Sequence, residues 1–235
     1  TNNTPDVLDE AMYNLKWMLT MIDTVDGCVA HKVTTKGFVS MVLPAETNDQ
    51  RYMIGKSTAT NYGFAAIMAK ASRLYKNNPD YPDFSEKAMR YAKQAYEWAE
   101  KNPGIIFHNP DSIWTGSYTV RFPEQFRFWA NVELYLATKE DKYVDLTAID
   151  TFDYDVPTWQ LPASLALMSL ITGVDNGTVK GALKKKTELH FSKLATFLYD
   201  RMEKSAGCFP LHKFEWGSNG SMSNAGSIFA ARLSR

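Results

Sequence analysis

The stretch "STATNYGFAAIMAKASRLYK" (Ser57–Lys76) decides the fold class of this chain of 235 residues. Its apolar side chains recur every three or four positions, the spacing that places them on one face of an α-helix. The pattern predicts a helix that opens at Ser57 and ends before Pro79. Along its apolar face we expect to find Phe64, Ile67, Met68, Ala71, Leu74 and Tyr75, with Phe64, Ile67, Met68 and Leu74 buried.

Helical periodicity also covers most of the remaining chain. Near the start, Pro5 suits the first turn of a helix, and apolar positions from Leu8 to Ile22 follow it at helical spacing. Further helices are expected at about residues 84–101, 124–138 and 179–204, from near residue 162, and from residue 218 to the end. No alternating strand of useful length and no low-complexity linker interrupts this series. The sequence therefore predicts an all-α fold with its function in the loops.

Three of these predicted helices show how they should pack. The segment "ASLALMSLI" (Ala163–Ile171) is apolar almost all round, so it should be buried. In the helix at residues 179–204 we expect Leu194 and Phe197 to be buried. The helix that begins near Phe84 has small side chains on one face, which favour a close approach to a neighbouring helix; they are Ala88, Ala92, Ala95 and Ala99.

Composition excludes several classes of function. The chain has 26 basic and 26 acidic side chains, so it lacks the electrostatic footprint of a protein that binds nucleic acid or an anionic membrane. No apolar run approaches the roughly 20 residues needed to cross a bilayer. Four scattered histidines and the absence of a CxxC pair indicate no metal site. For Cys28 and Cys208, two buried free thiols are favoured over a disulfide.

The connection between the first two predicted helices, from about Asp23 to Lys56, is longer than a turn requires. It contains the polar run "GCVAHKVTTKGF" (Gly27–Phe38). A segment of this length and polarity between two helices is typical of a binding loop. An uncharged partner that stacks on rings fits the high aromatic content of the chain, 13%, better than a charged partner.

Several motifs, taken in order, resemble the catalytic domain of glycoside hydrolase family 9. They are "LDEAMYNLKWMLTM", "HKVTTKGF", "STATNYGFAAIMAKASRLYK", "FWANVELYLATKEDKY" and "WGSN". The resemblance implies an (α/α)6 barrel with an open cleft built from the loops at one end. It also implies that residues 1–235 are part of one such catalytic domain, and that the barrel is incomplete in this chain. The implied protein is a secreted, periplasmic or cell-surface endoglucanase or cellulase that acts on β-glucan.

The resemblance leaves the catalytic residues unassigned. An inverting glycosidase needs one carboxylic acid and one carboxylate, roughly 6.5–9.5 Å apart, on either side of the scissile bond. The family supplies them from an Asp-Ala-Gly-Asp-like motif and from a glutamate beyond a His-Arg motif, and neither motif occurs here. We therefore expect both groups on sequence outside this chain. Asp9 and Glu10 are interpreted as solvated or helix-capping charges, and Glu133 as a paired buried carboxylate.

By resemblance, His31 lies on the cleft wall and contacts a sugar hydroxyl. A neutral imidazole offers one donor and one acceptor, which matches a hydroxyl that both gives and takes a hydrogen bond. The alternative is an ordinary loop histidine that is hydrogen-bonded to the backbone. Lys32 is left without a role.

Two tryptophans are candidates for stacking against sugar rings. Trp216, in "FEWGSN", matches a platform residue of the family, and the following glycine and serine favour a loop ahead of a helix. Its alternative is core packing. Trp159, in "PTWQLP", is a weaker candidate of the same kind, for which core packing is an equal alternative. Trp129 is expected to pack in the core.

The family often binds calcium near the segment that corresponds to "TGSY" (Thr115–Tyr118). An Asp-Glu pair that accompanies this site is replaced here by Gln125 and Phe126, although Glu124 is adjacent. A calcium ion prefers several oxygen ligands, mostly carboxylates and carbonyls. No cofactor is therefore expected, and calcium remains the one alternative.

Three hypotheses for function follow. The first is hydrolysis of β-1,4-glucosidic bonds in cellulose or related β-glucans, with a polysaccharide or oligosaccharide as partner. The second is a non-catalytic glycan-binding protein with a degenerate hydrolase cleft. The third is an unrelated helical toroid that serves as a protein-interaction scaffold.

Overall fold

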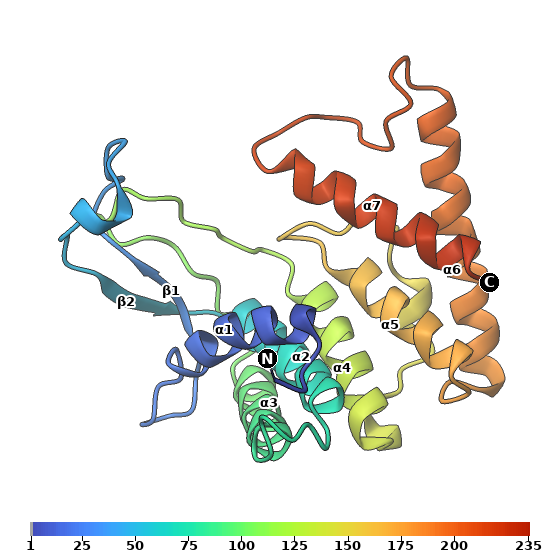
Figure 1. Ribbon diagram of the computed structural model, residues 1–235, viewed down its shortest axis with the longest axis horizontal. Helices are drawn as coiled ribbons and strands as arrows, with labels where there is room; N and C mark the ends of the chain where they lie inside the picture. Colours follow the sequence, from blue (N-terminus) through green and yellow to red (C-terminus); the bar gives the residue numbers. More distant parts are fainter. Residues whose placement is uncertain (1) are drawn as a thin grey trace. The chain divides into compact units, whose positions relative to one another are not determined.

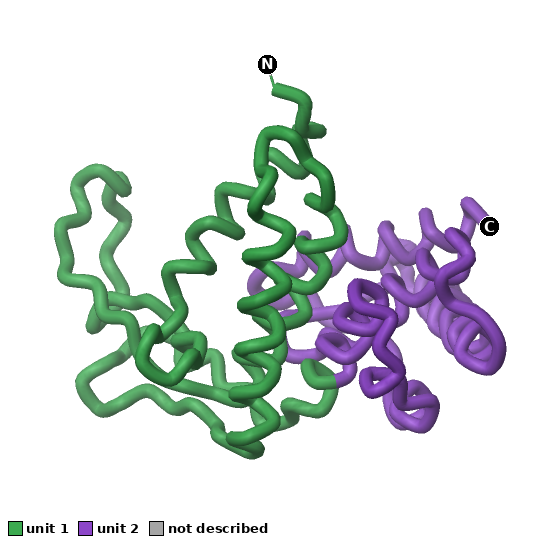
Figure 2. Tube along the Cα trace, turned by 90° about the horizontal axis from the view of Figure 1, so that it is seen from below, with its two compact units in different colours: residues 1–127 green, residues 128–235 purple. Residues whose placement is uncertain are grey.

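The computed structural model describes residues 2–235 and is 53% helix and 5% strand. The chain forms two compact units, residues 1–127 and residues 128–235 (Figure 2). Helices dominate both units, as the periodicity predicts. Among the described residues, no helix has a stretch long and apolar enough to cross a membrane.

Each helix predicted from the sequence is present, with bounds that agree closely with the prediction (Figure 1). Unit 1 contains α1 (Asp6–Leu19), β1 (Ala30–Thr34), η1 (Pro44–Glu46), β2 (Tyr52–Lys56), α2 (Thr58–Leu74), α3 (Phe84–Lys101) and the start of α4 (Glu124–Thr138). Unit 2 contains the rest of α4, η2 (Asp141–Tyr143), η3 (Ala148–Asp150), α5 (Ala163–Asp175), α6 (Gly181–Glu203) and α7 (Ser218–Leu233).

Helices α2 and α3 form the core of unit 1. The side chain of Ser57 caps α2 by accepting a hydrogen bond from the backbone N–H of Thr60 at 3.2 Å. Small side chains face each other between the two helices, so their backbones approach closely, as predicted for α3. The alanines of this α3 face, each no more than 1% exposed, are Ala88, Ala92, Ala95 and Ala99.

The burial predicted from periodicity is confirmed for Phe64, Met68 and Leu194 and is wrong for Leu74 and Phe197. Leu74 is 49% exposed, because it is the last residue of α2 and lies at the edge of the apolar face. Ile67 is half-buried and lies one heptad earlier on the same edge. Phe197 is 46% exposed, and the guanidinium of Arg201 covers its ring at 4.4 Å. Periodicity therefore located the buried faces but not their edges.

A two-stranded antiparallel hairpin, β1 paired with β2, lies in the long connection between α1 and α2. The sequence did not predict it. All five side chains of β1 are half-buried, so the alternation that identifies a strand does not arise. Buried Asn61 of α2 holds the start of the hairpin, since its Oδ1 accepts a hydrogen bond from the backbone N–H of Val29 at 2.8 Å.

Helix α5 forms the centre of the unit 2 core. Its side chains Leu167, Leu170 and Ile171 are at most 1% exposed, which confirms that "ASLALMSLI" is buried. Glu133 of α4 is also fully buried, and it accepts hydrogen bonds from Ser169 Oγ at 2.5 Å and from Trp129 Nε1 at 3.3 Å. The buried carboxylate is therefore held by hydrogen bonds, and Trp129 packs against the core as predicted.

Both cysteines are free, as expected, but only Cys28 is buried. Burial raises the pKa of the Cys28 thiol to about 11. The predicted burial of Cys208 is wrong. This residue follows α6 in a turn with a φ of 53°, and the turn carries its side chain to the surface.

Truncating a buried leucine of α6 should destabilise unit 2. We expect Leu194→Ala to lower the free energy of unfolding by about 2–5 kcal/mol, because it removes core contacts and leaves a cavity. Leu189, on the same helix, is 51% exposed, so Leu189→Ala serves as the matched control and should change stability by less than about 0.5 kcal/mol. Urea unfolding followed by circular dichroism measures both. Equal losses would contradict the assigned core.

Candidate functional site

His31 lies in β1, and both of its ring nitrogens are engaged within unit 1. Nδ1 lies 2.9 Å from Thr60 Oγ1 and 3.1 Å from Ser57 Oγ, and these two hydroxyl groups are 2.8 Å apart. Nε2 lies 3.2 Å from the carbonyl oxygen of Ser117. A carbonyl oxygen only accepts, so this contact assigns the proton to Nε2 and leaves Nδ1 to accept from a hydroxyl.

The surroundings of His31 favour the neutral imidazole. Burial is the main cause that lowers its pKa, and the positive charge of Lys32 acts in the same direction. The hydrogen bond to Ser117 opposes this shift without reversing it. The ring also stacks on Phe107, with centroids 4.2 Å apart and planes inclined by 27°. The half-buried His31 is therefore a fixed, uncharged group with one N–H and one acceptor nitrogen.

The ammonium of Lys32 ties β1 to the segment that follows α3. Its Nζ donates hydrogen bonds to the carbonyl oxygen of Gly116 at 2.7 Å and to Thr115 Oγ1 at 3.1 Å. Thr34 Oγ1 lies 2.7 Å from the same Thr115 hydroxyl. Figure 1 shows this green segment running beside the hairpin. Lys32, which the sequence left without a role, thus links the two segments through two hydrogen bonds.

The residues around Thr115–Tyr118 do not fit a calcium ion. Calcium takes about 6–8 oxygen ligands, several of them carboxylates. Here an ammonium is hydrogen-bonded to two of the available oxygens, at Thr115 and Gly116. Gln125 and Phe126 offer no carboxylate, and within residues 2–235 no three His, Cys, Asp or Glu side chains gather in a way that would hold a metal. At this loop a lysine side chain provides the positive charge.

Trp216 and Trp159 are exposed side chains of unit 2. Trp216 is fully exposed and directly precedes Gly217, whose φ of 81° leads into the first turn of α7. Trp159 is 56% exposed in the loop before α5. Neither ring is buried in the core of unit 2. The predicted loop position of Trp216 ahead of a helix is therefore found, while its contact with a sugar stays a prediction.

Two contacts fix the chain just before Trp159. The guanidinium of Arg201 donates two hydrogen bonds of 2.8 Å to the carboxylate of Asp155, just before the loop. The side-chain amide of Asn224, in α7, donates to the carbonyl oxygen of Pro157 at 2.9 Å. These contacts attach the Trp159 loop to α6 and to α7, the helix that follows Trp216.

His31 belongs to unit 1 and the two tryptophans to unit 2. That His31 and Trp216 share one cleft therefore stays a prediction. Sequence reasoning missed the contribution of Ser57 and Thr60 to the His31 site. The S-x-x-T spacing at the start of α2, a helix-capping pattern, is the signal that indicates it.

The acidic residues of α1 behave as expected. Asp9 and Glu10 are exposed in the first turns of the helix. The carboxylate of Asp9 accepts a hydrogen bond from the Tyr81 hydroxyl at 2.6 Å, and this bond lowers the pKa of Asp9. Both are solvated charges, and no pair of carboxylates in the chain is assigned to catalysis.

Comparison with known proteins gives consistent matches. The model of glycosyl hydrolase family 9 matches residues 1–233. A xyloglucan-specific endo-β-1,4-glucanase of Bacteroides ovatus is 43% identical over 150 residues, which cover 60% of this chain and 26% of that protein.

Two solved structures are also similar to the chain. A family 9 structure from Bacteroides ovatus has a TM-score of 0.80 and 34% identity, and the match covers 89% of this chain and 40% of that one. The structure of AaCel9A in complex with cellobiose-like isofagomine has a TM-score of 0.85 and 26% identity, covering 97% and 44%. The chain thus spans less than half the length of these proteins. The matches confirm the predicted (α/α)6 barrel fold class over most of the chain.

The lowered pKa of His31 makes its contribution to stability dependent on pH. The unfolded chain binds this proton more readily than the folded protein does, so acid favours unfolding. We expect the contribution to be complete above the unfolded pKa of about 6.5 and to decline as the pH falls through the folded pKa. The measurement is the difference in unfolding free energy between the wild type and His31→Gln across this range. A difference that grows toward low pH would contradict the assignment.

Replacing Lys32 should loosen the Thr115–Tyr118 segment. Hydrogen bonds from charged donors contribute roughly 1.5–3 kcal/mol, and partial exposure screens the charge, so we expect Lys32→Met to cost about 1–2 kcal/mol. Faster amide hydrogen exchange at this segment should accompany the loss. Lys36→Met is the matched control, because Lys36 is an exposed residue of the connection between α1 and α2. Calcium that protects these amides in the wild type would contradict a lysine-held loop.

Proposed function

Because the chain belongs to glycosyl hydrolase family 9, we propose that it is part of an enzyme that hydrolyses β-1,4-glucosidic bonds in cellulose or a related β-glucan. Support comes from the activities of its relatives, which include a xyloglucan-specific endo-β-1,4-glucanase and endoglucanase D of Acetivibrio thermocellus. The balance of acidic and basic side chains also suits an uncharged polymer. The proposed reaction is acid–base hydrolysis and requires no cofactor.

The observation that carries the proposal is the exposure of Trp216. Aromatic rings account for much of the binding energy in many sites, and a fully exposed indole on a loop is available for stacking. The flat face of the indole suits the axial C–H surface of a β-glucosyl unit. Trp159 offers a second ring on a loop that Arg201 and Asn224 hold in place.

His31 completes the proposed set of sugar contacts. Its Nε2–H bond to the Ser117 carbonyl is 3.2 Å long, and a sugar hydroxyl is an acceptor that is able to replace this carbonyl. The neutral state of the ring also avoids the cost of placing a charge against an uncharged sugar. We place His31 and Trp216 on one cleft of the folded enzyme, within a single catalytic domain to which residues 1–235 contribute.

We assign the two catalytic carboxyl groups to parts of the protein outside these 235 residues. The motifs that carry them in the family do not occur here. The buried Glu133 is held by Ser169 and Trp129, which suits a structural role better than proton transfer to a substrate. A polymeric glucan does not enter cells intact, so the enzyme is proposed to act as a secreted, periplasmic or cell-surface protein.

The full natural protein should release reducing ends from soluble β-glucan with inversion of the anomeric centre. We expect Trp216→Ala to weaken glucan binding by about 1–3 kcal/mol, which raises KM roughly 5- to 150-fold with a smaller change in kcat. Trp17→Ala on α1, a residue 52% exposed, is the matched control and should leave KM unchanged.

The same assay separates the alternatives. Glucan binding without release of reducing ends would identify the non-catalytic glycan-binding protein instead of the hydrolase. An unchanged KM for Trp216→Ala beside normal hydrolysis would show that this indole does not contact substrate. Neither binding nor hydrolysis of any β-glucan would overturn the proposed function.

A further inference from the structure

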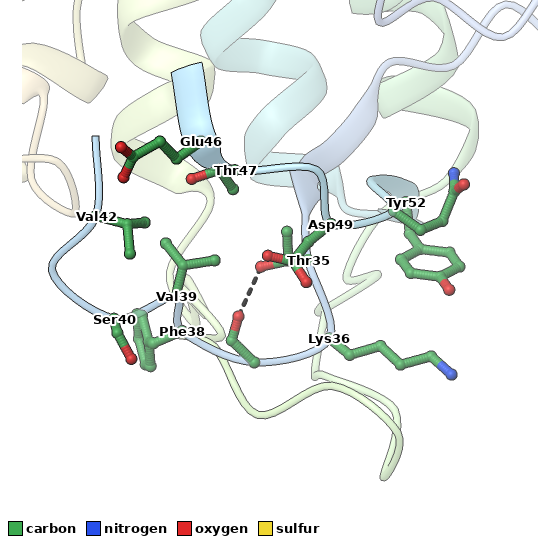
Figure 3. A pocket seen from close by; sticks show the side chains of 12 residues that line it. Thr35, Lys36, Phe38, Val39, Ser40, Val42, Glu46, Thr47, Asp49 and Tyr52 are labelled. Carbon is green, nitrogen blue, oxygen red and sulfur yellow. Dashed lines mark hydrogen bonds between the residues drawn. The ribbon is translucent and has the colours of Figure 1, made fainter. Parts of the chain in front are cut away.

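The connection between β1 and β2 borders an open hollow of about 600 Å³ (Figure 3). This size lies within the roughly 300–1,000 Å³ of sites that bind small molecules. The hollow is formed within unit 1, by η1, by the loops on either side of η1 and by Tyr52 at the start of β2. Thr35 shapes its wall, since its hydroxyl donates a hydrogen bond of 2.6 Å to the carbonyl oxygen of Gly37. None of the functions discussed above uses this space.

Hydrogen-bonding groups line the hollow. The carboxylate of Asp49 makes no hydrogen bond or ion pair with any of residues 2–235, so its oxygens are available as acceptors. Glu46 closes η1 by accepting from the backbone N–H of Leu43 at 3.4 Å, which leaves further acceptor capacity on its carboxylate. The hydroxyls of Ser40 and Thr47 add groups that both donate and accept.

Two exposed aromatic rings flank Gly37 at the rim. Phe38 lines the hollow and is 77% exposed, and Trp114 is 71% exposed. The backbone N–H of Trp114 donates to the carbonyl oxygen of Lys36 at 2.6 Å, which fixes this tryptophan beside the loop. Its ring lies over Gly37, where an added Cβ would be 3.8 Å from Cε3. The hollow thus combines apolar faces with acceptors and hydroxyls.

The charges identify the class of ligand. The lining contains two carboxylates, Glu46 and Asp49, and only one ammonium, that of Lys36, so an anion is disfavoured. The Lys36 ammonium lies 5.8 Å from the centroid of the Tyr52 ring, and Figure 3 shows the two side chains projecting on the same side of the hairpin. Among the described residues, no three His, Cys, Asp or Glu side chains gather in a way that would hold a metal ion. A neutral molecule with several hydroxyls fits this lining.

We propose that this hollow is a subsite for a sugar unit of the glucan chain, distant from the position that His31 contacts. The proposal rests on the proposed function and extends it. His31 and Thr35 lie on one extended segment, about 13 Å apart at the strand rise of roughly 3.3 Å per residue. A glucan that lies along β1 from His31 therefore reaches the hollow only when it is several units long. Phe38 stacks on that unit, and Asp49 accepts from its hydroxyls.

The test measures binding to the full natural protein by calorimetry, with cellohexaose as the long ligand and cellotriose as the short one. We expect Phe38→Ala to weaken cellohexaose binding about tenfold, the loss of one aromatic contact, and to leave cellotriose binding unchanged. Asp49→Asn should give a smaller loss with the same dependence on length. Tyr13→Ala is the matched control, because Tyr13 is an exposed aromatic of α1 with an exposure of 78%.

The outcomes distinguish this inference from the proposed function. If the wild type binds both ligands and Phe38→Ala binds them equally well, the subsite is wrong and the proposed function stands. Equal losses for both ligands would place Phe38 at the centre of the binding site and overturn the distant position. A wild type that binds neither ligand would overturn the inference together with the proposed function. Unchanged circular dichroism confirms that each variant is folded.

Discussion

The side-chain amide of Asn61 is the contact on which the organisation of unit 1 depends. It is fully buried, and its hydrogen bonds to the backbone N–H of Val29 and the carbonyl oxygen of Ser57 satisfy both ends of the amide. A buried amide without partners would cost several kcal/mol, so the chain before β1 has one favourable position against α2. That position sets the start of the hairpin and, two residues later, the place of His31.

This arrangement explains how a helical fold carries a site on a short hairpin. The first turn of α2 supplies Ser57 and Thr60 on one side of His31, and the segment after α3 supplies Ser117 on the other. The Lys32 ammonium holds that segment beside β1 through Thr115 and Gly116. The imidazole is therefore oriented by the first turn of α2 on one side and by the segment after α3 on the other.

The sequence predicted the helices well because their stability comes from one periodic feature, a stripe of apolar residues. The sequence did not predict features that depend on contacts outside this stripe. Leu74 and Phe197 have the right spacing but lie at the edges of their stripes, and Arg201 covers the ring of Phe197. The hairpin escaped detection because every side chain of β1 is half-buried. Its position is determined by the hydrogen bonds of Asn61, which no pattern in the strand itself reveals.

The sequence predicted the residues of the candidate site that lie in local motifs, but not the contacts between distant segments. Motifs located His31, Trp159 and Trp216, since each lies in a recognisable local sequence. They did not reveal that Lys32 bonds to Thr115 and Gly116, more than 80 residues away, because such a contact depends on how α3 returns the chain to β1.

The two cysteines give this chain a built-in chemical asymmetry. Thiol reagents attack the thiolate, and the pKa of about 11 leaves buried Cys28 almost entirely protonated at neutral pH. Cys208 is exposed in its turn after α6. A maleimide dye or spin label added to the unmodified chain would therefore attach to unit 2 alone, so this natural sequence provides a spectroscopic handle without any substitution.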